Sequence, residues 1–387
     1  MPAYGGGNTL GAGRLSVRRG CAMYALLLAT VLLLGEPDEG AIALDPPVVV
    51  EPAASVTALP AELRQRFHEE VLSSPATGRQ RLEQVLHFML DADALAITYD
   101  QGATYSVAQT YAQHRANCLS FTMLFLALAR EAEIDARPQE IEDTLSWHQE
   151  QNTIFRNNHI NAGVRIDGHA FTIDTSGDTL IAGDRPVAMS EQRLLAHYYN
   201  NLAMDQLAQG NVMAGQTLMD AALAQDATYA PIWSNAGVLL LRQGDVAAAE
   251  RAYRQALKLD PDEDGALFNM ISLSRRLGDA RREAEFRRRL DRVQQKDPLH
   301  HFMQAMDYER NGDYTQAIRH YRQAIRLHAD EHRFYSALAR AYLKAGNARG
   351  AGRALKRAQA LTDGATRAAY RAQLQELNLP GLKRSSN

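Results

Sequence analysis

The sequence has few cysteines, so disulfides cannot hold its fold together. Its 387 residues include only two cysteines, Cys21 and Cys118. Removal of an N-terminal leader, residues 1–43, would leave Cys118 alone, and a single cysteine excludes an intramolecular disulfide. The hydrophobic core must then stabilise the fold. A lone thiol in an exported protein indicates a reactive role, with a buried, inert cysteine as the alternative.

The sequence also lacks a strong net charge and an apolar run long enough for an ordinary membrane-spanning helix. The formal net charge is −3, without the basic patches of a nucleic-acid-binding protein. The apolar segment 22–35 is shorter than the roughly 20 residues that span a bilayer, and it is typical of a signal peptide. Ala41-Ile42-Ala43 then supplies a cleavage pattern. Residues 1–43 are therefore predicted to be a signal peptide, with a retained inner-membrane anchor as the alternative, and the protein is expected in the periplasm or cell envelope.

Two globular regions are expected after this leader. Prolines predict an extended linker over residues 44–59. Residues 60–190 begin with apolar residues at helical spacing and continue into alternating, strand-like segments. Residues 196–379 are Ala-rich and helical throughout, with Gly-Asn and Gly-Asp turns between the helices. The second region is therefore expected to be all-α.

The stretch from Asn117 to Arg137 carries the first candidate for chemistry. Nearly every residue from Leu119 to Ala129 is apolar and none is Gly or Pro, which predicts a helix buried on all sides. Asn117 is a favourable N-cap, so Cys118 is expected in the first helical turn, where the helix dipole favours a thiolate. Cys118 is therefore a candidate nucleophile, provided that a base lies nearby.

A hairpin downstream carries the candidate partners. Asp167-Gly168 between two alternating stretches predicts a type I′ turn, which pairs Ile166 with His169. In this register His159 and Asp174 are diagonal neighbours on one face of the hairpin. His169 falls on the apolar face, unless a bulge shifts the register by one residue and exchanges the faces.

Other polar residues are weaker candidates. His148 lies in a polar stretch that is expected to be a loop, and Asp178 follows the expected end of the strand. Asp91, Asp93 and Asp100 form an acidic stretch that a cation could bind, but a solvated helix end is the simpler interpretation. No metal and no cofactor are therefore expected.

The motifs around Cys118 resemble the transglutaminase-like superfamily, whose core is related to papain-type cysteine proteases. The resemblance covers roughly residues 60–190 and rests on a Cys that opens an apolar helix, a His on a strand and Ile-Asp after a hairpin. It implies an α+β domain in which the central Cys-bearing helix packs on an antiparallel sheet. It also implies a triad of Cys118 as nucleophile, His159 as base and Asp174 as the residue that orients His159. Glu133 departs from the pattern, because such sequences usually carry Gly there.

A triad of this kind performs acyl transfer. The Cys118 thiolate attacks an amide or acyl carbonyl, and His159 protonates the departing amine while Asp174 holds the imidazole in place. The acyl-enzyme is then released to water, as in an amidase or peptidase, or to a second amine, as in transamidation. The backbone N–H of Cys118 is the expected oxyanion donor.

Residues from about 196 onward repeat with a fixed period. Gly-Asn or Gly-Asp pairs begin at positions 210, 244, 278, 312 and 346, each 34 residues after the last. This period resembles the tetratricopeptide repeat family and predicts five helix pairs that start near 196, 230, 264, 298 and 332. A capping helix is expected at 365–377. The third repeat carries Glu283 and Arg287 where small and aromatic residues are usual, so a bend is expected there.

The resemblance to a repeat array implies a concave groove that binds a protein or peptide partner. The run of arginines from 281 to 292 could meet an acidic partner, but a solvated helix face is the simpler interpretation. The positions expected to face the groove are Asn200, Met204, Ser234, Phe268, Phe302, Met306, Arg333 and Arg340.

Two functions are consistent with these features. In the first, an exported cysteine-dependent acyl-transfer enzyme uses the repeats to recruit a protein or peptide. In the second, the transglutaminase-like unit is non-catalytic and the chain is a scaffold for protein–protein interaction. The presence of Cys118, His159 and Asp174 together favours the enzyme, because a scaffold has no reason to keep all three. Acyl transfer to an amine of a cell-envelope component is a weaker third alternative.

Overall fold

The computed structural model describes residues 14–16, 49–148, 153–175, 180–182 and 186–377. The apolar segment 22–35 lies outside these residues, as does most of the expected signal peptide. Within the described part of the chain, no helix is both long enough and apolar enough to cross a membrane.

Residues 49–59 pack against the repeat array, although their prolines predict an extended linker. They include the short helix α1 (Ala53–Val56). The carbonyl of Glu51 accepts a hydrogen bond of 2.6 Å from the hydroxyl of Tyr199 on helix α6 (Glu191–Ala208). Residues 49–59 therefore contact the first repeat directly.

Helices make up one layer of the N-terminal region, and α5 is its centre. Every residue of α5 from Leu119 to Ala129 is buried except the half-buried Leu126, which confirms the predicted all-round burial. Asn117 caps α5 through its side-chain oxygen, which accepts the backbone N–H of Ser120 at 2.9 Å. The helices of this layer are α2 (Ala61–Phe67) with a π-helical continuation (His68–Leu72), α3 (Gly78–Leu90), α4 (Val107–Gln113) and α5 (Cys118–Glu131).

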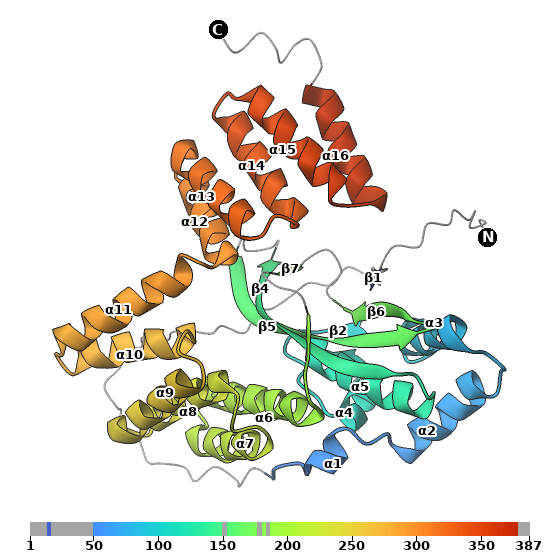
Figure 1. Cartoon of the computed structure of the whole chain (residues 1–387). Helices are drawn as coiled ribbons and strands as arrows, with labels where there is room; N and C mark the ends of the chain where they lie inside the picture. The colour runs from blue at the N-terminus through green and yellow to red at the C-terminus, as the bar shows by residue number, and fades with distance from the viewer. Residues whose placement is uncertain (1–13, 17–48, 149–152, 176–179, 183–185, 378–387) are drawn as a thin grey trace.

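The second layer is a mainly antiparallel sheet that contacts α5 (Figure 1). Its strand order is β1-β6-β5-β4-β7, with β8 also paired to β4, and β1 is the one strand that runs parallel to its neighbour in this described sheet. A separate two-stranded sheet joins β2 to β3. The strands are β1 (Arg14–Ser16), β2 (Thr98–Tyr99), β3 (Arg115–Ala116), β4 (Ala136–His148), β5 (Thr153–Ile166), β6 (His169–Asp174), β7 (Leu180–Ala182) and β8 (Val187–Ala188).

The β5–β6 hairpin has the predicted turn and register. Asp167 and Gly168 adopt φ values of 51° and 77°, as a type I′ turn requires, and Ile166 pairs with His169. Ile160 and Ala162 on the predicted core face are buried. The opposite face is covered as well, because His159 and Asn161 are only 4% and 1% exposed. The hairpin is therefore enclosed on both faces near His159.

The repeat helices follow the 34-residue period. The first helices of repeats two to five begin at 230, 264, 298 and 332, as predicted, whereas the first repeat begins at 191. The glycines that begin the five turn pairs all have positive φ, between 72° and 89°, which explains why glycine recurs there. The helices are α6, α7 (Val212–Gln225), α8 (Ala230–Arg242), α9 (Val246–Leu259), α10 (Asp264–Arg276), α11 (Ala280–Gln294), α12 (Pro298–Arg310), α13 (Tyr314–Leu327), α14 (His332–Lys344), α15 (Ala348–Ala360) and α16 (Gly364–Leu377).

The array is interrupted after the third repeat. Helix α7 packs on α8, α9 on α10 and α13 on α14, but within the described chain α11 makes no comparable contact with α12. Figure 1 shows α12–α16 turned away from α6–α9, with the β4–β5 hairpin between the two groups. Only Leu290 of α11 is buried, and Glu283 and Arg287 pair with each other instead of filling a helix crossing. The bend expected from these residues is therefore present.

Candidate functional site

The thiol of Cys118 lies at the first turn of α5, where a loop holds the helix start in place. The side-chain amide of Asn117 donates to Thr104 Oγ1 at 2.8 Å. Ser120 Oγ accepts the backbone N–H of Tyr105 at 2.7 Å and donates to the carbonyl of Ala103 at 3.0 Å. Cys118 itself is only partly buried. The start of α5 therefore holds the thiol on a rigid helix.

The structure brings Cys118, His159 and Asp174 together. His159 Nε2 lies 2.8 Å from Asp174 Oδ1, and the imidazole also hydrogen-bonds to the Cys118 thiol. Because Nε2 bonds to Asp174, Nδ1 is the atom left for the thiol. The arrangement of nucleophile, base and orienting carboxylate is the one that activates a thiol.

The surroundings favour a thiolate–imidazolium pair. Burial opposes the charge on both groups. At Cys118 the hydrogen bond and charge of His159 outweigh burial, so the thiol pKa is lowered from its ordinary value. At His159 the hydrogen bonds to Asp174 and Cys118 outweigh burial, so the imidazole pKa is raised. Both shifts favour the thiolate–imidazolium pair over the neutral thiol and imidazole.

Asn161 also belongs to the site, although no role for it is predicted from the sequence. Its side-chain amide donates to Asp174 Oδ2 at 3.3 Å, so the two oxygens of Asp174 have separate partners. Asn161 is almost completely buried, and no described partner bonds to its side-chain oxygen. Its place two residues after His159, on the same strand face, was the available signal.

The weaker candidates lie elsewhere. His169 is exposed at the hairpin turn, where its ring contacts the carbonyl of Asp167 at 3.0 Å. His148 is the last residue of strand β4 rather than a loop residue, and Asp178 is outside the described residues. In the acidic stretch, Asp100 pairs with Arg115.

The residues predicted to face the groove have varied environments. Asn200 accepts a 2.8 Å hydrogen bond from Asn235 of the next repeat, and Ser234, which is buried, accepts one of 3.1 Å from Asn269. Phe268 is 39% exposed and available to a partner. Met204 is half-buried against the main hydrophobic core. The first two repeats thus contribute mostly polar groups that link neighbouring helices.

The later groove candidates are more strongly engaged within the chain. Phe302 is buried between the rings of Tyr321 and Phe334, so it is a core residue and not a groove residue. Helical spacing alone could not separate these two environments. The remaining candidates are the half-buried Met306, Arg333 paired with Glu331, and Arg340 paired with Glu309.

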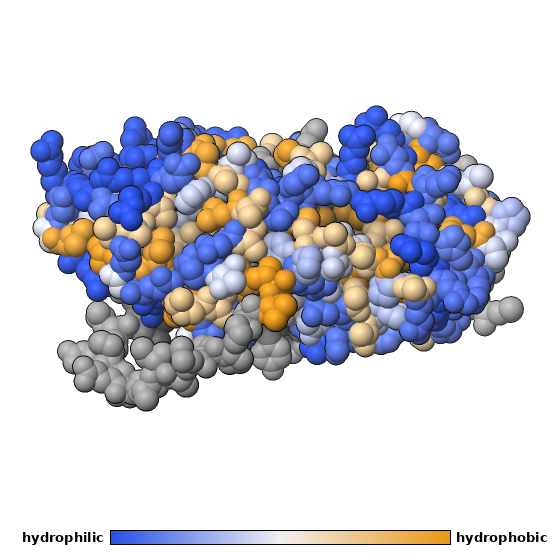
Figure 2. Space-filling model, turned by 90° about the horizontal axis from the view of Figure 1, so that it is seen from below, coloured by the Kyte–Doolittle hydropathy of each residue, from blue (hydrophilic) through white to orange (hydrophobic). Residues whose placement is uncertain are grey.

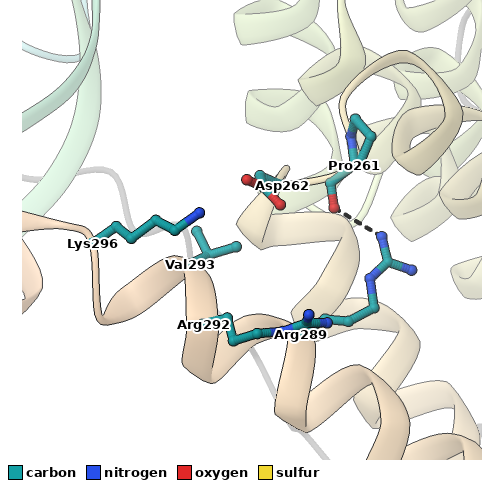
Figure 3. A pocket seen from close by; sticks show the side chains of 6 residues that line it. All are labelled: Pro261, Asp262, Arg289, Arg292, Val293 and Lys296. Atoms are coloured by element: carbon teal, nitrogen blue, oxygen red, sulfur yellow. Dashed lines mark hydrogen bonds between the residues drawn. The ribbon is translucent and has the colours of Figure 1, made fainter.

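A basic pocket of about 250 Å³ lies where α11 meets the loop between α9 and α10 (Figure 3). Arg289, Arg292 and Lys296 line it, with Asp262 as the one acidic residue of the lining. Arg289 donates to the carbonyl of Pro261 at 2.8 Å. On the face seen in Figure 2, apolar residues form separate patches among hydrophilic ones. The pocket therefore suits an anionic group. The face seen in Figure 2 has no single large apolar surface.

Comparisons with known proteins concern the repeats. A tetratricopeptide repeat family model matches residues 200–264, 234–294 and 302–366. The proteins named Tetratricopeptide repeat protein 16 from Homo sapiens and Macaca fascicularis are each 30% identical to this chain over 101 residues. That alignment covers 26% of this chain and only 12% of each of those proteins.

Solved structures of repeat proteins are also similar. TTC0263, a thermophilic TPR protein of Thermus thermophilus, is 20% identical, with a TM-score of 0.26 and coverage of 46% of this chain and 99% of that chain. YrrB, described as a TPR protein with an unusual peptide-binding site, is 16% identical, with a TM-score of 0.25 and coverage of 46% and 92%. Scores this low carry no argument about function.

The family match lies within residues 200–366 and gives no support to the transglutaminase-like resemblance of residues 60–190, which stays a prediction. It therefore supports partner binding more directly than chemistry at Cys118. The regular turns and helix starts agree with the family model. The region that follows the sheet is built from tetratricopeptide repeats.

Proposed function

We propose that this protein is a cysteine-dependent acyl-transfer enzyme whose repeats recruit a protein or peptide. The observation that carries the proposal is the contact of one imidazole with both the Cys118 thiol and the Asp174 carboxylate. A buried structural cysteine needs neither partner. The proposal assigns the N-terminal region to the transglutaminase-like superfamily, and the predicted leader places the reaction in the periplasm or cell envelope.

The proposed reaction has two balanced halves. The Cys118 thiolate attacks the carbonyl carbon of an amide, the C–N bond breaks, and the His159 imidazolium gives its proton to the departing amine. The product is a thioester on Cys118 with neutral His159. Water or a second amine then attacks the thioester, His159 takes the proton of that nucleophile, and the thiolate leaves. Asp174 remains ionised and holds the ring in both halves.

The first experiment measures the reactivity of the thiol. In the full chain with Cys21→Ser, Cys118 is the single cysteine, and its alkylation by iodoacetamide is followed against pH. Labelling at pH 6 should be at least tenfold faster than that of a free thiol, whose pKa is about 8.5. His159→Ala should abolish this advantage, because the thiolate loses its positive partner.

Two further measurements make the test decisive. Asp174→Asn should slow labelling less than His159→Ala does, because the imidazole remains but is poorly oriented. A hydroxylamine trap with a mixture of peptide amides should yield hydroxamates only when Cys118 is present. If Cys118 labels no faster than a free thiol in the folded protein, the enzyme proposal is wrong.

The second candidate function is a scaffold without catalysis, and the repeat match favours it. In this case the array binds a partner whether or not Cys118 is reactive. The basic pocket at Arg289, Arg292 and Lys296 suits an acidic segment of such a partner. Arg292→Glu with Lys296→Glu should then weaken binding of acidic peptides at least tenfold, whereas Arg353→Glu on α15 should not.

A further inference from the structure

A buried polar network joins the sheet to the first two repeats. Glu140 of β4 accepts a hydrogen bond of 3.1 Å from Arg193 Nη1 and lies 3.0 Å from His197 Nε2, both on α6. Arg193 also pairs with Asp226, between α7 and α8. Glu140 and His197 are each only 5% exposed. The network therefore fixes the placement of the repeats on the sheet.

Tyr229, the residue that precedes α8, lies within this network. The guanidinium carbon of Arg193 is 4.1 Å from the centre of the Tyr229 ring, and the His197 ring centre is 4.9 Å away. The hydroxyl of Tyr229 accepts a hydrogen bond from the side-chain amide of Asn158 on β5. A buried tyrosine of the repeat array thus contacts the strand that carries His159.

The contact falls where the strand ladder is interrupted. His159 pairs with Ile141, but the next described pair is Asn157 with Thr144, because a bulge shifts the register between them. Asn158 lies at this shift and directly precedes His159. A bulge loosens the local ladder and changes where side chains point. The hydrogen bond from the Asn158 amide to the Tyr229 hydroxyl holds the strand at the position where regular pairing is absent.

Successive side chains of a strand point to opposite faces, so Asn158 and His159 hold the strand from two sides. His159 bonds to Asp174 and Cys118, whereas Asn158 bonds to Tyr229. A small rotation of this backbone would move the imidazole relative to the thiol. Displacements of roughly 0.5 Å are enough to impair a catalytic arrangement.

We infer that Tyr229 is a positioning residue for His159 and acts through Asn158, so that the turn between the first two repeats completes the catalytic site. This inference rests on the proposed acyl-transfer function. Tyr229 precedes the same helix, α8, that carries the predicted groove residue Ser234. The residue that positions His159 thus caps a helix of the repeat array.

The test substitutes Tyr229→Phe in the full chain with Cys21→Ser. This change removes the hydroxyl but keeps the ring against Arg193 and His197. Alkylation of Cys118 should be about three- to tenfold slower below the apparent pKa of the thiol and nearly unchanged above it. The reason is that a loosened imidazolium stabilises the thiolate less and raises the apparent pKa by about 0.5 to 1. A loss of stability alone would not produce this pH pattern.

Tyr199→Phe is the matched control. It removes the hydroxyl of another buried tyrosine, which bonds to the carbonyl of Glu51 and not to β5. Its pH profile should match that of the parent protein. Asn158→Ala should reproduce the effect of Tyr229→Phe, and the double variant should be no slower than Asn158→Ala alone, because both changes break one linkage.

Three results would overturn the inference: an unchanged profile for Tyr229→Phe, an equal shift for Tyr199→Phe, or effects of the Asn158 and Tyr229 changes that multiply. Failure of the acyl-transfer proposal has a different signature. In that case the parent protein and His159→Ala label alike at every pH, before any tyrosine is changed.

Discussion

The two ends of the repeat array follow the same sequence period but have different neighbours. Repeats one and two share one continuous hydrophobic core with α5 and the sheet, which includes Tyr198, Leu218 and Ile232. Repeats four and five enclose a separate core of their own, which includes Phe302 and Tyr321. The interruption after α11 divides the two. One end therefore packs as part of the N-terminal unit, and the other packs around a core of its own.

This difference shows which residues determine the contacts that a repeat makes with the rest of the chain. Turn glycines with positive φ are present at both ends, and they set the local helix pair. The charged residues that depart from the pattern differ: Arg193 and His197 bond to Glu140 of the sheet, whereas Arg340 bonds to Glu309 within the array. The 34-residue period specifies the helix pairs. The charged residues outside the repeat pattern specify what each pair contacts.

The largest expected effect comes from breaking the network at the sheet. Glu140→Ala removes the carboxylate from the buried His197 and leaves Arg193 with Asp226 as its remaining acidic partner. Two hydrogen bonds to a buried carboxylate are lost, each of about 1.5–3 kcal/mol, so the free energy of unfolding should fall by about 3–6 kcal/mol. Urea denaturation followed by tryptophan fluorescence and circular dichroism measures it.

Glu250→Ala is the control for that change. Glu250 pairs with Arg254 and Arg282 on the outside of α9 and α11, and its side chain is 22% exposed. Exposed pairs contribute about 0–1 kcal/mol, so its effect should be small. An equal fall in the free energy of unfolding for Glu140→Ala and Glu250→Ala would show that the network at the sheet stabilises the fold no more than an exposed ion pair does.

The next largest effect is expected from Gly→Ala changes, which should differ between tightly packed and open positions of the array. A Cβ placed on Gly237 would lie 2.4 Å from the Tyr253 ring, so Gly237→Ala should cost about 1–3 kcal/mol through overpacking. A Cβ placed on Gly352 of α15 would have no atom within 4 Å other than those of its chain neighbours and its own helix backbone. Gly352→Ala should instead stabilise by about 0.5–1 kcal/mol, because alanine favours the helix. Thermal unfolding of both variants checks the opposite signs.

Local features could be predicted from the sequence because local chemistry determines them. Asp167-Gly168 allows the positive φ values of a type I′ turn, and the turn then sets the strand register that joins His159 to Asp174. The helix around Cys118 follows from an uninterrupted apolar run with Asn117 as its cap. The turn glycines similarly gave the starts of repeats two to five.

Contacts between distant segments could not be predicted in this way. No local pattern relates Glu140 to Arg193, or Asn158 to Tyr229, because each pair is brought together by the docking of two regions. The same reason applies to Phe302, whose helical spacing shows that it points inward but not whether it meets the core or the groove. The polar stretch that ends at His148 forms a strand because β5 pairs with it.

The smallest expected effect concerns the distal end, where the Glu309 carboxylate accepts hydrogen bonds from Arg340 at 2.7 and 2.9 Å and from the Tyr321 hydroxyl at 2.7 Å. Burial opposes the ionisation of Glu309, but these bonds hold its pKa below the ordinary value. Arg340→Ala should therefore cost about 1 kcal/mol at neutral pH, since Arg340 is half-exposed.

A lowered pKa in the folded state stabilises the fold above the unfolded-state pKa of about 4.3, and this contribution disappears as pH falls through the folded-state value. The difference in unfolding free energy between the parent protein and Arg340→Ala should thus shrink from pH 6 towards pH 3. Arg310→Ala, which breaks an exposed pair with Asp307, should show almost no difference at any pH. A pH-independent loss for Arg340→Ala would instead mean that the arginine stem stabilises the repeats by packing, and that the distal end, unlike the sheet-side end, does not depend on its charges.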